Sequence, residues 1–191
     1  MGELDLVLSA ALGIGLAAAT GFRVFLPLLV MSLAANAGYF PLSEGFTWLS
    51  SPGALAMLAI AAILEIVAYY IPGIDNLLDT LATPSAIIAG IAISAAVMTD
   101  VPPMLKWTLA IIAGGGVAGL TQGATTFTRA NSTVFTGGLG NPVIATAELG
   151  GALLVSILAI AAPYLALFVV VFLILMTVLI IKKIKRKNSI R

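Results

Sequence analysis

The sequence predicts an all-α integral membrane protein with six or seven transmembrane or re-entrant helices. Hydrophobic residues make up 61% of its 191 residues, charged residues make up 9%, and the mean hydropathy is +1.16, which is far above that of soluble domains. Apolar runs recur along the whole chain, separated by Pro, Gly and polar residues. Crossing a hydrocarbon core about 30 Å thick takes about 20 helical residues. Several runs approach that length.

The first apolar stretch, residues 4–38, is too long for one crossing at about 1.5 Å rise per residue. Gly21 and Pro27 interrupt it. The ring of Pro27 pushes against the carbonyl four residues earlier, which belongs to Arg23, so the sequence predicts a helix break beside a charge. Two arrangements are open: two short crossings over about 4–21 and 24–38, or one crossing with a re-entrant half-helix.

Five further runs have near-spanning length: 54–71, 85–99, 104–128, 142–161 and 164–181. Between the first two lies PGIDNLLDTLATP, in which Asp75, Asp79 and Thr83 recur every fourth residue. This spacing predicts a short interfacial helix with an acidic edge. Asp75 and Asp79 are then either simply solvated at the membrane surface or part of a cation or proton site at a cavity mouth.

The segment 119–142 is too polar for a lipid-facing helix, because it carries Thr125 and seven other hydroxyl and amide side chains: Thr121, Gln122, Thr126, Thr128, Asn131, Ser132 and Thr133. Either the Thr hydroxyls bond to their own helix and the later part is a surface loop, or the segment lines a polar cavity. Gly137 and Gly138 predict a helix break. Asn141 suits the N-cap of the next helix, and Pro142 suits its first position.

Both unusual stretches contain small residues at four-residue spacing, and an arginine follows each ladder: Gly13, Ala17 and Gly21 before Arg23, and Gly115, Gly119 and Gly123 before Arg129. Such ladders let helices approach closely in lipid. We therefore expect residues 1–181 to form one polytopic domain with two related halves, 5–99 and 104–181. Repeated halves with interrupted helices are typical of transporters with a midplane site.

Four charged residues lie inside apolar runs: Arg23, Glu65, Arg129 and Glu148. A charge at mid-bilayer costs roughly 2.5 to 3.5 kcal/mol on insertion scales, so each residue needs a partner or water. Three roles are open for them. They form two Arg–Glu pairs that tie helices together, or they gate or coordinate a passing solute, or they snorkel near a helix end. We expect each arginine to lie close to Glu65, Glu148, Asp75 or Asp79, with at least one pair beside a solvent-accessible cavity.

Six basic residues follow the last apolar run, within residues 182–191. The positive-inside rule places this tail in the cytoplasm, as a topology anchor or a binding site for anionic lipid. The chain has no Cys and no His, which removes the usual reagents of enzymes and metal sites. We expect no enzymatic activity, no cofactor, no metal and no nucleic acid partner.

Two motifs, PGIDNLLDTLATP after Glu65 and TGGLGNPVIATAE ending at Glu148, resemble those of the bacterial membrane proteins grouped as domain of unknown function 4126. The resemblance covers most of residues 5–180. It implies a shared fold and site in a bacterial cytoplasmic membrane, with the motif positions at Glu65, Pro72, Asp75, Asp79, Gly137, Gly138, Asn141, Pro142 and Glu148. The chain departs from the family pattern at Tyr69-Tyr70 and Leu149, where many members carry charge. The family has no established activity.

We therefore expect a small permease or channel for a small ion or solute, with the charges around a central polar cavity. The alternative is a non-transporting membrane scaffold or assembly protein, in which the charges are static helix–helix pairs and the tail binds lipid. A polar cavity lined by both carboxylates and several Thr favours the first, and paired charges in a dry core favour the second. The lipid bilayer is a partner in either case, and a homo-oligomer is left open.

Overall fold

A computed structural model describes the backbone of residues 3–71 and 73–188 and the side chains of residues 6–71, 73–75 and 77–176. Within these residues the chain is helical, with no strand. The elements are α1 (Glu3–Thr20), α2 (Phe25–Asn36), η1 (Thr47–Ser50), α3 (Pro52–Ala68), α4 (Ile74–Val97), α5 (Pro103–Leu109), η2 (Ala110–Gly115), α6 (Gly116–Thr136), α7 (Asn141–Ala161) and α8 (Pro163–Asn188).

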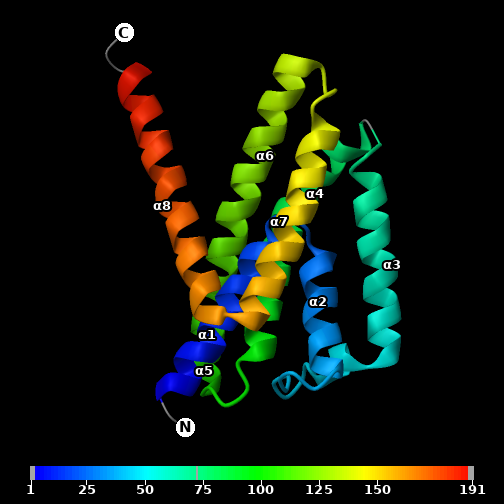
Figure 1. Ribbon diagram of the computed structural model, residues 1–191, viewed down its shortest axis with the longest axis vertical. Coiled ribbons are helices and arrows are strands. Elements are labelled where there is room, and N and C mark those ends of the chain that lie inside the picture. Colours follow the sequence, from blue (N-terminus) through cyan, green and yellow to red (C-terminus); the bar gives the residue numbers. More distant parts are fainter. Residues whose placement is uncertain (1–2, 72, 189–191) are drawn as a thin grey trace.

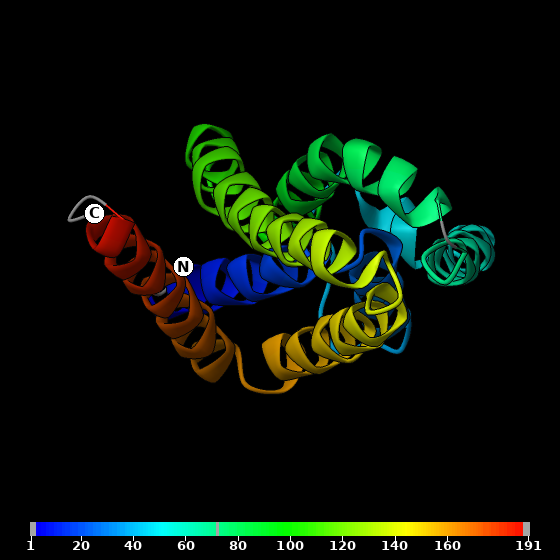
Figure 2. The same ribbon diagram turned by 90° about the horizontal axis from the view of Figure 1, so that it is seen from above.

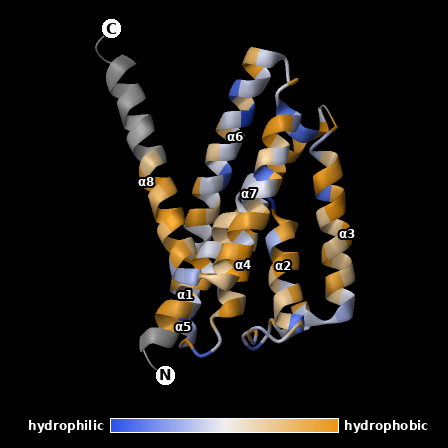
Figure 3. Cartoon of the chain, in the orientation of Figure 1, coloured by the Kyte–Doolittle hydropathy of each residue, from blue (hydrophilic) through white to orange (hydrophobic). Residues whose placement is uncertain are grey.

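Three helical stretches are long and apolar enough to cross a membrane: Leu77–Val97, Pro103–Thr136 and Asn141–Ala161. Four shorter apolar helical stretches accompany them: Leu6–Thr20, Phe25–Asn36, Pro52–Ala68 and Pro163–Met176. Figure 3 shows hydrophobic residues along α3 and α8, and hydrophilic residues gathered on α6 and the facing start of α4. The prediction of an all-α chain built from apolar helices is confirmed in this coarse form.

Helices α1 and α2 form a hairpin that turns inside the bundle. In Figure 1, α1 rises from the lower end, stops near mid-height, and α2 returns to the lower end. The predicted break is confirmed, but it covers residues 21–24, and Pro27 does not cause it. Pro27 is buried in the first turn of α2, where a helix needs no N–H donor. Both helices are among the shorter apolar helical stretches, and the break between them lies inside the bundle.

Helix α4 contradicts the expected short interfacial helix. It runs unbroken for 24 residues from Ile74 through the exposed Pro84 to Val97 and joins two predicted segments. Proline removes one backbone hydrogen bond, but α4 packs extensively against α1 and η2, and this packing outweighs the loss. Asp75 and Asp79 thus belong to the first turns of a long helix.

Helices α5, η2 and α6 join into one rod over residues 103–136, so most of the polar segment is helical. Side-chain hydroxyls bond to carbonyls of the same helix, as Thr125 does to Gln122 at 2.9 Å and Thr128 to Ala124 at 2.9 Å. The back-bonding half of that alternative is met, but the surface loop is not, because α6 continues to Thr136. The predicted break follows at Gly137 and Gly138, whose φ angles of 64° and 90° are left-handed and suit glycine.

Helix α1 lies at the centre and contacts α4, α6, α7 and α8, as the view from above in Figure 2 shows. Its small residues permit this. A Cβ on Gly13 would lie 3.2 Å from the backbone of Ser94 in α4, and the hydroxyl of Ser94 donates to the carbonyl of Gly13 at 2.9 Å. The ladders are thus close-packing positions, except Gly123, where an added Cβ meets nothing within 4 Å.

Two other predictions are not tested by the structure. The relation between the halves 5–99 and 104–181 stays a prediction, and their ladders differ locally because α1 ends at Thr20 whereas α6 continues past Arg129. The backbone of α8 extends into the basic tail, but the side chains of residues 182–191 lie outside those described. Anionic lipid binding by the tail therefore stays a prediction.

Candidate functional site

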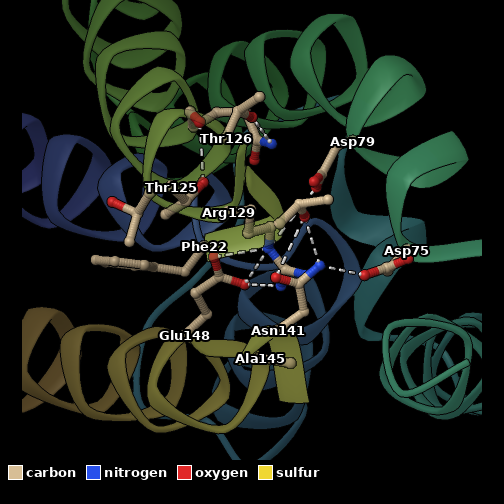
Figure 4. Close-up of polar contacts among 12 residues, drawn as sticks. Phe22, Asp75, Asp79, Thr125, Thr126, Arg129, Asn141, Ala145 and Glu148 are labelled. Carbon is tan, nitrogen blue, oxygen red and sulfur yellow. Dashed lines mark hydrogen bonds and ion pairs between the residues drawn. The ribbon is translucent and has the colours of Figure 1, made fainter. Parts of the chain in front are cut away.

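The tip of the α1–α2 hairpin meets the end of α3, the start of α4, and the middle of α6 and α7 (Figures 1 and 4). A short 3₁₀-like turn closes the tip, because the N–H of Gly21 donates to Ala18 at 3.2 Å and the N–H of Phe22 to Ala19 at 3.0 Å. Arg23 follows this turn. The hairpin thereby carries a charged side chain from the surface end of the bundle to its interior.

Glu148 of α7 binds both buried arginines. Arg23 Nη1 donates to Glu148 Oε2 at 2.9 Å, and Arg129 Nε lies 3.0 and 3.1 Å from the two carboxylate oxygens. Arg129 Nη2 also contacts Oε2. The exposed fractions are 1% for each arginine and 5% for Glu148, so these charges depend on one another for solvation. Figure 4 shows Arg129 beside Glu148.

Each arginine thus lies against an acidic residue, as predicted, but the expectation of two separate Arg–Glu pairs is wrong. Arg23 reaches α7 because the hairpin tip points there, and its Nη2 donates to the carbonyl of Ala145 at 2.9 Å. Asp79 of α4 is a second carboxylate for Arg129, with 3.7 Å between Asp79 Oδ1 and Arg129 Nε. Glu148 therefore binds both arginines, and Arg129 contacts two carboxylates, those of Glu148 and Asp79.

Glu65 does something else: it caps helix α2. Its carboxylate accepts the N–H of Val24 at 2.7 Å through Oε1 and the N–H of Phe25 at 3.0 Å through Oε2. The N–H groups in the first turn of a helix have no partner within the helix, and at membrane depth no bulk water replaces one. The negative charge also suits the positive end of the helix dipole. Glu65 therefore satisfies two backbone N–H groups at the start of α2, inside the bundle.

Tyr69 is a site residue that the sequence analysis did not identify. The sequence marked Tyr69-Tyr70 only as a departure from the family pattern, but Tyr69 is 5% exposed. The guanidinium carbons of Arg23 and Arg129 lie 4.0 and 4.2 Å from the centroid of its ring. Tyr69 therefore contributes a cation–π surface between α3 and the arginines. Its spacing of four residues from Glu65 was the available signal, since it continues the same helical face.

A hydrogen bond between Asp75 and Asn141 connects the start of α4 to the start of α7. Asn141 Nδ2 donates to Asp75 Oδ2 at 2.8 Å and to Thr133 Oγ1 at 3.0 Å, and Asp75 Oδ1 accepts the N–H of Gly73 at 2.9 Å. Asp75 is 4% exposed, so it is not simply solvated. The N-cap prediction for Asn141 is wrong: Gly140 occupies that position, and Asn141 and Pro142 are the first two helical residues.

Thr125 and Gly21 fix the hairpin tip against α6. Thr125 Oγ1 lies 3.4 Å from the carbonyl oxygen of Gly21. Gly21 follows the last residue of α1, so this carbonyl lies outside the helix. A Cβ on Gly21 would lie 2.4 Å from Thr121 Cβ and 2.6 Å from the carbonyl oxygen of Ala118. Only glycine lets the tip approach α6 this closely.

The charges of the site do not balance, and some polar atoms lack hydrogen bonds. Two guanidiniums face four carboxylates: Glu65, Asp75, Asp79 and Glu148. Arg23 Nε, Arg129 Nη1 and Asp79 Oδ1 are buried with no hydrogen-bond partner among the described residues. A buried polar atom without a partner costs about 1–3 kcal/mol. The ion pairs therefore leave part of the hydrogen-bonding capacity of the site unsatisfied.

A cavity of about 350 Å³ lies beside the site, between the start of α2, α3 and α4. It differs from the expected polar cavity. Its walls are mostly apolar, and Glu65 is the only predicted site residue among those that line it. The expectation that an Arg–acid pair borders a cavity is not met here, because Tyr69 and Glu65 separate the arginines from it. No group of three or more acidic side chains suited to a metal occurs among the described residues.

The model of the family described as domain of unknown function (DUF4126) matches residues 10–183. The chain belongs to this family. The match runs from α1 into α8 and includes every residue of the site described above. No curated protein matches the chain, and no solved structure matches it. Family membership therefore accounts for the shared motifs but names no function.

Proposed function

We propose that the chain is a multi-pass membrane permease or channel for a small ion or solute, with the hairpin tip as its gate. The observation that supports this proposal is the α1–α2 hairpin, whose internal tip bears Arg23 at 1% exposure. Interrupted helices are tolerated at membrane depth where protein or water covers them, and transporters place them at their binding sites. A purely structural protein has less need to end two helices inside the bilayer.

The proposed topology has five crossings: α3, α4, the rod of α5, η2 and α6, then α7 and α8. The α1–α2 hairpin enters from one side and returns to it, which makes seven transmembrane or re-entrant helices. From the basic tail and the positive-inside rule, we propose that the upper end of Figure 1 faces the cytoplasm of a bacterium. Exposed Trp48 and Trp107 then belong to the opposite membrane interface, where indole rings are enriched.

The charge surplus favours a cation or proton as one of the transported species. Four carboxylates and two guanidiniums carry an excess of two negative charges when all are ionised. Burying net negative charge is expensive, so a proton or a bound cation at one of these carboxylates would stabilise the site. Arg129 already contacts two carboxylates, Glu148 and Asp79. A change of partner by Arg129 is therefore a short movement that could accompany passage.

A scaffold or assembly protein is the second candidate, and one observation favours it. Arg23, Arg129 and Glu148 are paired and almost fully buried, which is also the arrangement of a static helix–helix contact. Under this alternative the charges specify how α1, α6 and α7 assemble, and no solute passes. The two candidates differ in one measurable property, which is flux.

Reconstituted liposomes test the proposal. Purified protein in liposomes is assayed for flux of protons, Na⁺, K⁺, Cl⁻ and small organic ions with internal dyes and isotopes. We expect flux of at least one solute above protein-free liposomes. The double variant Asp79→Asn/Arg129→Gln removes an opposite pair and leaves Arg23 paired with Glu148, so it should fold and lose flux. If no solute passes through the wild type, or flux is unchanged in the folded double variant, the scaffold alternative replaces the permease.

A further inference from the structure

The cavity between α3 and α4 has the composition of a ligand site. Its volume of about 350 Å³ falls in the range of pockets for small molecules, about 300–1,000 Å³. The lining side chains are Val24, Phe25, Ala61, Leu64, Glu65, Ala68, Tyr69, Leu78, Leu81, Ala82 and Ser85. An apolar wall with very few polar groups is typical of sites that bind a mostly hydrophobic molecule through one polar anchor.

The polar anchor in this cavity is anionic. Glu65 is the only carboxylate among the lining residues, and no lysine or arginine is among them. Each oxygen of Glu65 accepts one backbone N–H from the start of α2, which leaves further acceptor capacity on both. Phe25 adds aromatic surface beside it, whereas the ring of Tyr69 already contacts the guanidiniums of Arg23 and Arg129. Carboxylate and aromatic groups in an apolar wall are complementary to an organic cation.

The cavity also lies where such a molecule would arrive. Leu64 on α3 and Leu81 on α4 line it and are 64% and 57% exposed. Helices α3 and α4 contact each other little, whereas α3 packs mainly on α2, so in the proposed topology the groove between α3 and α4 would open to the bilayer. Hydrophobic cations partition into a membrane and reach this gap by lateral movement.

We propose that this cavity, the α3–α4 groove, binds lipophilic organic cations from the bilayer, with Glu65 as counter-ion. The inference rests on the proposed function in one respect: it names the substrate class of the same permease. Because Glu65 also caps α2 beside Arg23, a cation that draws on its charge acts directly on the hairpin tip. Substrate binding and the position of the tip are thereby linked.

Equilibrium binding to protein in nanodiscs of zwitterionic lipid tests the groove without any flux. The probes are tetraphenylphosphonium and tetraphenylborate, which share size and shape and have opposite charge, with empty nanodiscs as background. We expect saturable binding of the cation alone. Glu65→Gln should weaken it at least about tenfold, because a charge-assisted interaction becomes a neutral one.

A second pair of variants leaves Glu65 untouched. Leu81→Trp fills the groove and should abolish saturable binding of the cation. Leu77→Trp, one turn earlier on α4 and 63% exposed, does not line the groove and should bind like the wild type. This matched pair keeps the test valid even if Glu65→Gln fails to fold.

Several outcomes would overturn the inference. They are absence of saturable cation binding, equal binding of both probes, and unchanged binding by Leu81→Trp or by folded Glu65→Gln. A phospholipid that copurifies in the groove and resists displacement by the cation would also overturn it. Cation binding without liposome flux would retain the groove and refute the permease, whereas flux of other solutes without cation binding would refute the groove alone.

Discussion

Glu148 is the residue on which the charges of the site depend, because both arginines bind it. We predict that Glu148→Gln lowers stability by about 3–5 kcal/mol, since it leaves two buried guanidiniums without their shared carboxylate. Arg23→Gln should cost clearly less, because Glu148 keeps Arg129. Thermal unfolding of the purified protein in detergent measures the difference. Glu44→Gln, at an exposed acid, is the control. Equal melting temperatures for the two site variants would contradict the shared-carboxylate arrangement.

The sequence predicted the members of this cluster better than their pairing. A charge in an apolar run needs a partner, which was enough to select Arg23, Arg129 and Glu148. Which acid each arginine binds depends on where the hairpin tip lies in the folded bundle. No local sequence pattern predicts that position. Glu65 illustrates the limit. It is buried in a similar run, yet it binds backbone N–H groups at the start of α2, which no sequence spacing marks.

At the scale of elements, the close contact between the hairpin and α6 depends on Gly21. A Cβ there would lie 2.4 Å from Thr121 Cβ and 2.8 Å from the backbone nitrogen of Gln122. We predict that Gly21→Ala destabilises the protein by about 1–3 kcal/mol through overpacking. Gly123→Ala is the matched control in α6, where an added Cβ meets nothing within 4 Å, and it should be neutral or stabilising by about 0.5–1 kcal/mol.

The same melting experiment tests both glycines. A fall in melting temperature confined to Gly21→Ala supports the close contact of the tip with α6. Equal changes in both variants would show that helix propensity decides the result, and that the tip has room for a methyl group.

Element boundaries were predicted where backbone chemistry is local and missed where packing decides. The left-handed Gly137 and Gly138 follow from residue type. The break before Arg23 was predicted at the right place, but Pro27, on which the prediction relied, lies in the first turn of α2. Pro84 and the polar residues of α6 suggested helix ends that do not occur. Contacts of α4 with α1, and hydroxyl bonds such as that of Thr128 to Ala124, sustain the two helices. These contributions arise only after the helices assemble.

At the scale of the whole molecule, the hairpin determines which loops share a side of the membrane. The start of α1, the loop between α2 and α3, and the loop between α4 and α5 lie at the lower end in Figure 1. The turns between α3 and α4 and between α6 and α7 lie at the upper end, as does the end of α8. The hairpin tip lies between the two ends. Two short crossings would instead place the tip at the upper surface.

Cysteine labelling distinguishes these arrangements cleanly, because the chain has no native cysteine. The probes are Glu44→Cys in the lower loop, Leu139→Cys in the upper turn, and Phe25→Cys at the tip. With an impermeant maleimide, we predict that Glu44→Cys reacts only in intact cells and Leu139→Cys only in inverted vesicles, since in the proposed orientation the upper end faces the cytoplasm. Phe25→Cys should react from neither side and become reactive after denaturation. Phe25→Cys reacting together with Leu139→Cys would mean that α1 crosses the membrane, and Leu139→Cys reacting in intact cells would reverse the orientation.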